Sequence, residues 1–345
     1  MGNDKMNMRL RSFGRMVIGM ALVVSATAMG ADYKPPRMAD GTPDLQGVWT
    51  NATATPLERA SELGNRRAFS AVEAAAIQEK ALAMVAADAA PSDPNKKIEA
   101  GALPPVGNYN LFWTDRGMSV QVINGENRTS MIIDPPNGRI PPIRPEAAQR
   151  RAAARAVTES SADGPEQRGL GERCLLSFGS SGGPPMLPTM YNSYYQFIQT
   201  PDYVMILVEM VHDVRIVRMG GRHLPDSVRK WMGDSIGHWE GDTLVVETKN
   251  FRSDQSFRGS SADMVVTERF TRAAQDQIVY RFTIDDPSTF AVPFTGELAF
   301  APANGNIYEY ACHEGNYALP GILAAEREKE KADAAAATRA AKATK

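Results

Sequence analysis

The sequence predicts a mainly β fold, either an antiparallel barrel or a two-sheet sandwich. A series of short strand-like segments runs through residues 191–312, and turn residues such as Pro201-Asp202 separate them. In the segment 277–284 (QIVYRFTI), every second residue is apolar, which is the period-2 pattern of a strand with one buried face. Many short strands with turn signals between them are typical of barrels and sandwiches.

The N-terminal part, residues 31–157, is expected to wrap the β domain as an extended and helical segment with short strands. The stretch 55–91 is predicted to be helical, because Ser70 and Glu73 match a capping box and Pro91 ends the run. Short strands are expected in GVWT, YNLFW, MSVQVI and RTSMII, and a solvent-facing helix over 145–157.

A polar stretch at 158–173 is the best linker in the chain, and residues 174–325 are expected to form the antiparallel β domain. Within it, 192–210 and 264–285 match hairpins, and 238–251 turns at Gly-Asp into a strand. PFTGELAF and NIYEYAC continue the series. The tail, 326–345, is charged and Ala-rich, which predicts a frayed helix or disorder. We favour one β-rich domain over two, because the strands expected before 157 are too few to build a core alone.

Residues 1–30 have the pattern of a secretory signal peptide. Lys5, Arg9, Arg11 and Arg15 precede the apolar run MVIGMALVVSATA, which ends in small residues. Cleavage after Ala28 or Gly30 fits the pattern, and a periplasmic or secreted protein is expected. The alternative is an uncleaved anchor, although the run is too short to span a bilayer comfortably, so no permanent membrane span is expected.

The overall charge excludes one class of partner. The formal net charge is -2, with 23% charged residues, which gives no electrostatic case for binding nucleic acid. The sequence carries no indication of the oligomeric state.

Cys174 and Cys312 are the two cysteines of the chain. In an oxidising compartment, they are expected to form a disulfide that closes a long loop. The alternative is a pair of buried, unpaired thiols that pack as small apolar groups.

Three of the four histidines have an acid one or two residues further along the chain. A carboxylate next to a histidine can hold the ring in one tautomer and tune it as an acid or base. The alternative for each is a structural hydrogen bond. We take as candidates His212 with Asp213, His238 with Glu240, and His313 with Glu314. His212 lies where the apolar run YVMILVEM ends, and a bend or bulge is expected there, because a continuous strand would be unusually long.

No cofactor motif is present, so no cofactor is expected. The histidines lack the short spacing of a strong metal motif, and metal binding is a minor alternative. Residues 179–183 match G-x-S-x-G, but Pro184, Pro185 and Pro188 follow and exclude the helix of a nucleophile elbow. The Gly-rich loop is expected to cover one end of the barrel.

Glu268 is the sharpest single candidate. In MVVTERFTR it shares a face with Val266 and Phe270, so its carboxylate is expected to point inward and to need a partner. The candidate cations are Arg215, Arg258 and Arg281. A raised pKa would suit acid-base catalysis, and the alternative is a structural Glu–Arg pair.

Several blocks of sequence together resemble a large group of exported bacterial proteins of unassigned function: RTSMIIDPPNGRIPP, ERCLLSFGSSGGPP, VEMVHDVRIV, GDSIGHWEGDTLVVETKNF, VVTERFTR and YEYACHEGNY. The resemblance implies export and places His212, His238 and His313 in signature blocks, without a catalytic assignment. The C-terminal β series also resembles lipocalin-like barrels, which hold small apolar ligands; fold alone does not establish function.

Three hypotheses for function follow. The first is an enzyme (lyase, isomerase or hydrolase) acting on a small organic molecule, apolar or aromatic, in a barrel pocket. There His212 would be the base, Glu268 or His313 the acid, and Arg215 a stabiliser of negative charge. The second is a lipocalin-like protein that binds such a molecule without turnover. The third is a structural protein with a filled barrel. Clusters of aromatic residues, such as YNSYYQF, either line a pocket or form the core.

Overall fold

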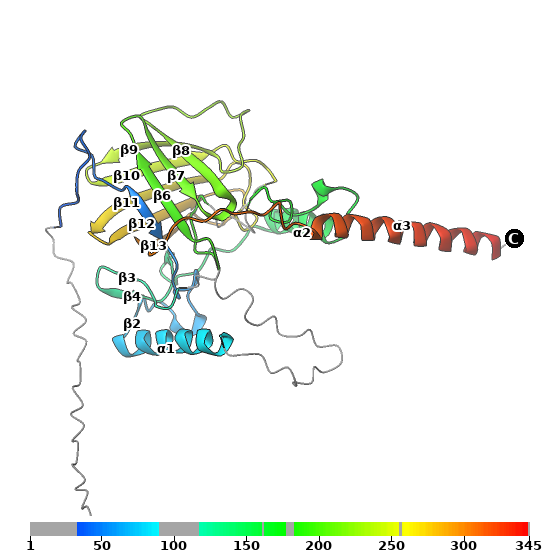
Figure 1. Cartoon of the computed structure of the whole chain (residues 1–345), viewed down its shortest axis with the longest axis horizontal. Coiled ribbons are helices and arrows are strands. Elements are labelled where there is room, and N and C mark those ends of the chain that lie inside the picture. Colours follow the sequence, from blue (N-terminus) through cyan, green and yellow to red (C-terminus); the bar gives the residue numbers. More distant parts are fainter. Residues whose placement is uncertain (1–32, 90–116, 161, 177–182, 255–256, 344–345) are drawn as a thin grey trace, which may run out of the picture.

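The computed structural model describes residues 33–89, 117–160, 162–176, 183–254 and 257–343. Its main feature is a closed β-barrel of mixed strand direction, which nine of the described strands form (Figure 1). The predicted signal peptide and the segment YNLFW lie outside the described residues. Around the ring, the strands are β1 (Gly47–Thr50), β6 (Tyr194–Gln199), β7 (Tyr203–Val208), β8 (Asp213–Met219), β9 (Asp234–Glu240), β10 (Thr243–Lys249), β11 (Val265–Ala274), β12 (Gln277–Asp285) and β13 (Phe294–Pro302).

The barrel is closed by a strand from the N-terminal part of the chain. β1 pairs with β6 along its length, and Trp49 and Thr50 also pair with Pro302 and Ala301 of β13. β5 (Ile132–Asp134) adds to the other end of β13. The barrel of the two predicted alternatives is therefore confirmed, and segments on both sides of the expected linker contribute strands to it.

The two predicted hairpins are confirmed in β6–β7 and β11–β12, and the predicted turn at Gly241-Asp242 joins β9 to its antiparallel partner β10. One pairing differs from the antiparallel arrangement that we expected. β8 and β9 are parallel, with Val217 opposite Ser235 and Met219 opposite Gly237. A parallel pair needs a crossover connection, and residues 220–233 provide it.

The end of β7 also differs from the expectation. Instead of a bend or bulge in one long strand, the chain makes the short turn η4 (Met210–His212) and reverses into β8, which pairs antiparallel with β7. Val211 and His212 adopt φ values of 77° and 64°, which are uncommon for residues with a Cβ. The turn places His212 at the rim and Arg215 on the inner face of β8.

The core lies inside the barrel. The four residues of β12 that were predicted to share a face are all fully buried: Ile278, Tyr280, Phe282 and Ile284. Aromatic rings from β6, β11 and β13 meet them, and Phe197, Phe270, Tyr280 and Phe300 make edge or tilted contacts with centroids 4.9–6.1 Å apart. Aromatic contacts of this kind stabilise a core beyond the area that they bury.

A glycine lets one of these rings lie flat on the wall. Gly296 of β13 is opposite Phe282, and a Cβ added to Gly296 would lie 2.2 Å from the Phe282 ring. We expect Gly296→Ala to lower the free energy of unfolding by about 1–3 kcal/mol, the usual cost of overpacking a core. Urea unfolding measures it. Gly315→Ala is the matched control, because its Cβ would meet no atom within 4 Å; equal effects of the two substitutions would contradict this account.

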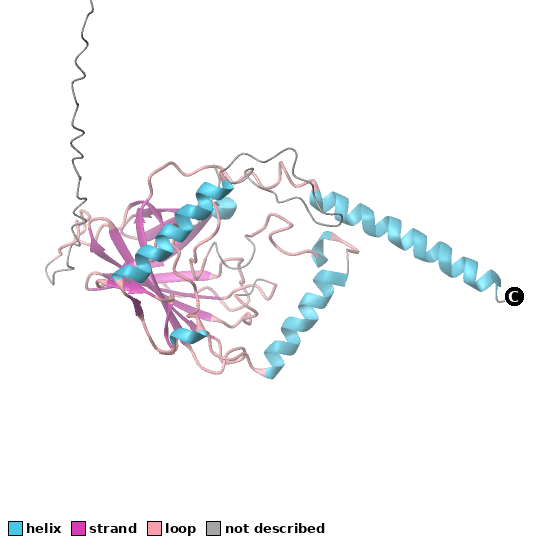
Figure 2. Ribbon diagram, turned by 90° about the horizontal axis from the view of Figure 1, so that it is seen from below, coloured by secondary structure: helices cyan, strands magenta, loops and turns pink. Residues whose placement is uncertain are grey.

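A smaller sheet and a helix pack beside the barrel (Figures 1 and 2). The sheet contains β2 (Ala68–Phe69), β4 (Glu126–Arg128) and β3 (Val122–Ile123), and β2 leads into α1 (Ala71–Asp88). The predicted capping box at Ser70 is confirmed, but the helix begins only at Ala71. The preceding residues, 55–69, form the turn η1 (Ser61–Leu63) and β2 rather than helix.

An ion-pair cluster attaches this layer to the outside of the barrel. Glu297 points outward from β13 and is 1% exposed. Its two carboxylate oxygens accept from Arg128 of β4 at 2.6 Å and from Arg281 of β12 at 2.7 Å. Gln121 adds hydrogen bonds to the backbone of β13 at Glu297 and Ala299. The N-terminal segment therefore covers the outer face of β12 and β13.

The C-terminal part corrects one expectation. NIYEYAC was predicted to be a strand, but no strand follows Pro302 in the described chain, and 303–317 consists of turns and irregular backbone. The predicted disulfide is confirmed: Cys174 and Cys312 are joined, with their Cα atoms 5.7 Å apart. The long helix α3 (Ala318–Ala343) follows and extends away from the barrel, while α2 (Pro145–Ser160) and the turn η3 (Pro165–Gln167) precede Cys174 (Figures 1 and 2).

Candidate functional site inside the barrel

The centre of the candidate site is a buried ion pair that crosses the barrel interior. Arg215 of β8 is 3% exposed and Glu268 of β11 is fully buried. The guanidinium donates twice, with Nη1 3.1 Å from Oε1 and Nη2 2.5 Å from Oε2 of the carboxylate. β9 and β10 separate these strands around the ring, so the pair bridges the interior rather than neighbouring strands. Such a two-pronged pair is among the stronger hydrogen-bonded contacts in proteins.

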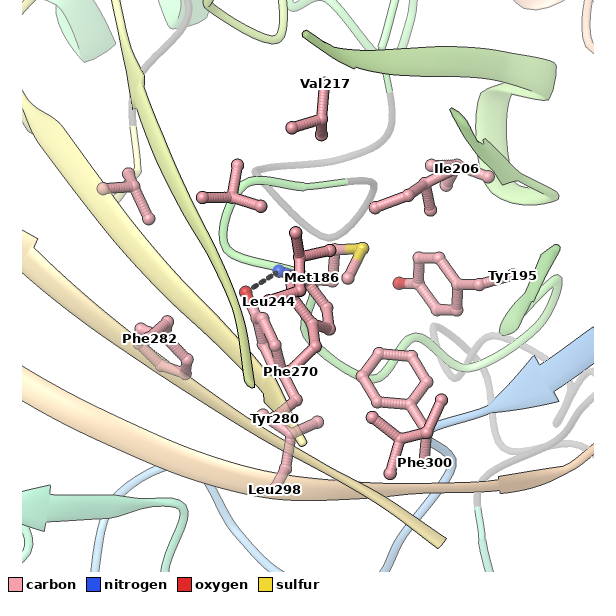
Figure 3. Packing of buried hydrophobic residues seen from close by; sticks show 14 of the residues in the cluster. Met186, Tyr195, Ile206, Val217, Leu244, Phe270, Tyr280, Phe282, Leu298 and Phe300 are labelled. Carbon is pink, nitrogen blue, oxygen red and sulfur yellow. Dashed lines mark hydrogen bonds between the residues drawn. The ribbon is translucent and has the colours of Figure 1, made fainter. Parts of the chain in front are cut away.

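Tyr280 extends the pair into a chain of hydrogen bonds. Its hydroxyl donates to Oε1 of Glu268 at 2.8 Å and accepts from the backbone N–H of Met186 at 3.0 Å. The backbone carbonyl of Met186 accepts from Nδ2 of Asn51, directly after β1, at 3.1 Å. The network therefore joins β1, β8, β11 and β12 through one residue of the connecting segment 183–193, and Figure 3 shows the Met186–Tyr280 bond.

Two polar atoms of the network have no partner. Nε of Arg215 and Oδ1 of Asn51 are buried and make no hydrogen bond with any residue in the described ranges. Buried polar groups are nearly always paired, because leaving one unpaired costs about 1–3 kcal/mol. An unpaired donor and an unpaired acceptor in one apolar interior are a physical reason to look for a ligand there.

The charges of the network balance. Burial alone would lower the pKa of Arg215, but the adjacent Glu268 outweighs it, and the pKa is raised. Burial raises the pKa of Tyr280 well above its ordinary value, and Glu268 adds to the rise. Burial likewise raises the pKa of Tyr195, which a hydrogen bond with Asn51 partly opposes. The two phenols are therefore neutral at neutral pH, and they lie beside the Arg215–Glu268 ion pair.

Apolar side chains surround this network. Figure 3 shows Met186 between Leu244, Phe270 and Tyr195, with Phe300 and Leu298 on the wall below them. All are buried. A mainly aromatic lining with a few polar groups is the usual composition of a site for a small organic molecule, and it is also the composition of many cores.

The structure joins two of the six predicted catalytic residues, Arg215 and Glu268, in one contact. His212 and His313 are exposed. Asp213 accepts from the backbone N–H of Val214 at 2.8 Å. His238 is 60% exposed, and its Nε2 lies 3.1 Å from Glu240. Catalysis by these residues stays a prediction.

The hydrogen bonds of Glu268 restrict what it can do. Arg215 and Tyr280 donate three bonds to its two oxygens, so it is an acceptor with no free proton to give. If Glu268 acted as a general acid, one of these three hydrogen bonds would first have to break. Across the described ranges, no group of three or more His, Cys, Asp and Glu side chains is arranged to hold a metal ion.

A second polar cluster was missed in the sequence, and it organises the crossover between β8 and β9. Asp234 is fully buried and accepts from Arg218 at 2.8 and 2.9 Å and from Leu224 N at 3.0 Å. His223, the histidine that was not among the candidates, lies 3.1 Å from Asp234 and 3.1 Å from Glu247 of β10. Its partners are distant in sequence, so no local pattern marks it.

Asp234 gives a prediction for pH dependence. Burial would raise its pKa, but the hydrogen bonds from Arg218 and Leu224 outweigh burial and hold the pKa well below the usual range. Because the folded pKa is lowered, the stabilisation is complete above the unfolded pKa of about 3.9 and is lost as pH falls below it. We expect Asp234→Asn to cost about 1–3 kcal/mol at pH 7, and less at pH 3. Urea unfolding at both pH values measures the difference; a constant cost would contradict this role.

Comparison of the chain with protein-family models, curated proteins and solved structures gave no match. The interpretation of this site rests on its geometry. In the described part of the chain, no helix combines the length and apolar character that a membrane crossing requires.

Proposed function

We propose that the protein binds a small, largely apolar or aromatic organic molecule inside the barrel, beside Arg215, Glu268 and Tyr280. One observation carries the proposal: an aromatic-lined barrel interior contains a polar network in which a donor, Nε of Arg215, and an acceptor, Oδ1 of Asn51, have no partner among the described residues. A ligand with hydrogen-bonding groups would pair with these two atoms. A purely structural core would leave them unpaired.

Binding without turnover fits the network better than acid-base catalysis. The charged groups, Arg215 and Glu268, already hold each other, and the histidines proposed as acids and bases are exposed. Proton transfer by Glu268 would first require one of its hydrogen bonds with Arg215 or Tyr280 to break.

Benzophenone is a suitable probe, because it is a neutral aromatic ketone that forms covalent bonds with nearby C–H groups on irradiation. We expect saturable labelling of inward-facing residues such as Met186 and Leu298, and competition by N-phenyl-1-naphthylamine, a neutral apolar dye. Mass spectrometry of the peptides locates the label. Labelling confined to outward-facing residues such as Ile216, or labelling that does not saturate, would refute binding in the interior.

A matched pair of double variants tests the polar network. Arg215→Met with Glu268→Gln removes the ion pair inside the barrel, and Arg128→Met with Glu297→Gln removes the similarly buried pair outside it. We expect the first variant to change the affinity for benzophenone at least tenfold and the second to leave it unchanged. Equal effects would show that the network does not contact the ligand.

We also propose that the protein is exported to the periplasm or secreted. The Cys174–Cys312 disulfide supports an oxidising compartment. If residues 1–30 are a signal peptide, the intact mass of the natural protein corresponds to a chain that begins after Ala28 or Gly30. A natural protein that retains Met1 would contradict cleavage.

A further inference from the structure

Met186 lies in the barrel in the manner of a bound peptide. It belongs to no helix or strand, yet its side chain is fully buried in the core. Its N–H and C=O bond to side chains of the barrel wall, Tyr280 and Asn51, rather than to a neighbouring strand (Figure 3). Recognition of one backbone donor and one backbone acceptor, with a side chain in an apolar environment, is how proteins bind extended peptides.

The approach of this segment to the ion pair is close. Gly183 has a φ of 104°, and a Cβ there would lie 2.8 Å from Cγ of Met186 and 3.5 Å from Nη1 of Arg215. Only glycine tolerates both the backbone conformation and the short distance. The chain therefore enters the interior along Arg215 and places Met186 on the polar network.

We propose that residues 183–187 are an internal occupant of the binding site, and that the ligand is a neutral, largely apolar molecule that displaces Met186. The ligand would offer an N–H or O–H to Tyr280 and a carbonyl to Asn51, as Met186 does. This inference rests on the function proposed above, and it adds the class of ligand and the way in which it enters.

The ligand is neutral because the polar network offers no unpaired charged group that could act as its counter-ion. Arg215 and Glu268 neutralise each other, and the polar groups beside them, Tyr280, Tyr195 and Asn51, are uncharged at neutral pH. A charged ligand would lose its hydration without meeting a counter-ion, which is strongly unfavourable.

Three matched compounds test the ligand class. Methyl hippurate is neutral and has an N–H and a carbonyl separated by one carbon, like a residue of a peptide. Hippurate has the same skeleton with a carboxylate, and methyl (benzoyloxy)acetate replaces the N–H by an oxygen. We expect calorimetry to give the tightest binding for methyl hippurate, with at least tenfold weaker binding of the other two. Equal or tighter binding of hippurate would overturn the class.

A variant of Met186 tests the displacement. Met186→Ala weakens the packing of residues 183–187 inside the barrel and leaves Tyr280 and Asn51 in place. A ligand that competes with this segment binds more tightly when the segment leaves more easily. The dissociation constant of methyl hippurate should therefore fall at least tenfold. The control is Met264→Ala, another fully buried methionine of the core. An unchanged constant in Met186→Ala would overturn the displacement.

Hydrogen exchange of the unaltered protein separates displacement from simple filling of a cavity. On binding of methyl hippurate, peptides that cover 183–190 should exchange faster, because Met186 N–H leaves Tyr280; slower exchange would overturn the proposal. If benzophenone labels the interior but methyl hippurate does not bind, the ligand class is wrong and the proposed function stands. If neither compound binds, the proposed function falls with it.

Discussion

Arg215→Met should lower the free energy of unfolding by about 3–5 kcal/mol, the largest effect that we expect of a single side chain in this protein. The substitution leaves the carboxylate of Glu268 fully buried with Tyr280 as its remaining partner in the described interior. Adding Glu268→Gln should restore most of the loss, because glutamine carries no charge and still accepts from Tyr280. Urea unfolding followed by tryptophan fluorescence measures all three free energies.

The outer ion pair is the control for this prediction. Arg128→Met removes an equally buried arginine, but Glu297 retains Arg281 at 2.7 Å, and Arg281 is half exposed. The loss should therefore be clearly smaller than for Arg215→Met. Equal losses, or a loss below about 1 kcal/mol for Arg215→Met, would mean that the inner carboxylate is not an isolated charge once the arginine is gone.

The second large effect is expected at the disulfide. Replacing both Cys174 and Cys312 by serine should cost about 4 kcal/mol, because the bond joins residues 138 positions apart and restricts the unfolded chain. The folded protein should also open locally. Residues 303–317 have no regular structure, and their other anchors include the buried carboxylate of Glu209, which accepts from Tyr308 N at 2.8 Å.

Two measurements separate the global effect from the local one. Urea unfolding gives the loss of stability, and hydrogen exchange of peptides within 303–317 gives the local opening. Glu209→Gln removes the charge of one non-covalent anchor and should cost no more than about 1 kcal/mol. A double serine variant with an unchanged unfolding midpoint and unchanged exchange would show that the bond is not needed to hold this segment.

Much of the barrel could be predicted because its signals are local. The alternation of apolar residues in β12 identified its inward face. The same alternation in β11 correctly predicted that Glu268 points inward with Val266 and Phe270. Proline, glycine and aspartate located the turns of the hairpins. The capping box at Ser70 was recognised, because a cap depends on a few consecutive residues, but the helix was predicted from residue 55 and begins only at Ala71.

The errors share a different cause. NIYEYAC alternates like a strand, but its segment is held by a disulfide and by Glu209 rather than by a neighbouring strand. The parallel β8–β9 pair and the Asp234 cluster depend on a crossover, whose geometry no short pattern encodes.

The candidate site was found in part. Because alternation placed Glu268 on the inward face, a cationic partner was predicted for it, and Arg215 was one of three candidates. Only the strand topology identifies Arg215 as the partner, because β8 faces β11 across the interior. Acids one or two residues away drew attention to His212, His238 and His313, but all three histidines are exposed, and the contact of His238 with Glu240 is exposed too. The role of Met186 has no signal in the sequence beyond the glycine and prolines before it.

The closure of the barrel by β1 has a consequence for how the chain folds. Trp49 of β1 pairs with Pro302 of β13, so β1 cannot form this pairing until β13 has been synthesised. Contacts between such distant residues slow folding, since a large loop must close before any stabilisation is gained. Until β13 has been made, the outer edges of β1 and β12 lack their partner strand, and unpaired edges are prone to association with other chains. A nascent chain of this topology therefore cannot close its barrel until β13 has been synthesised.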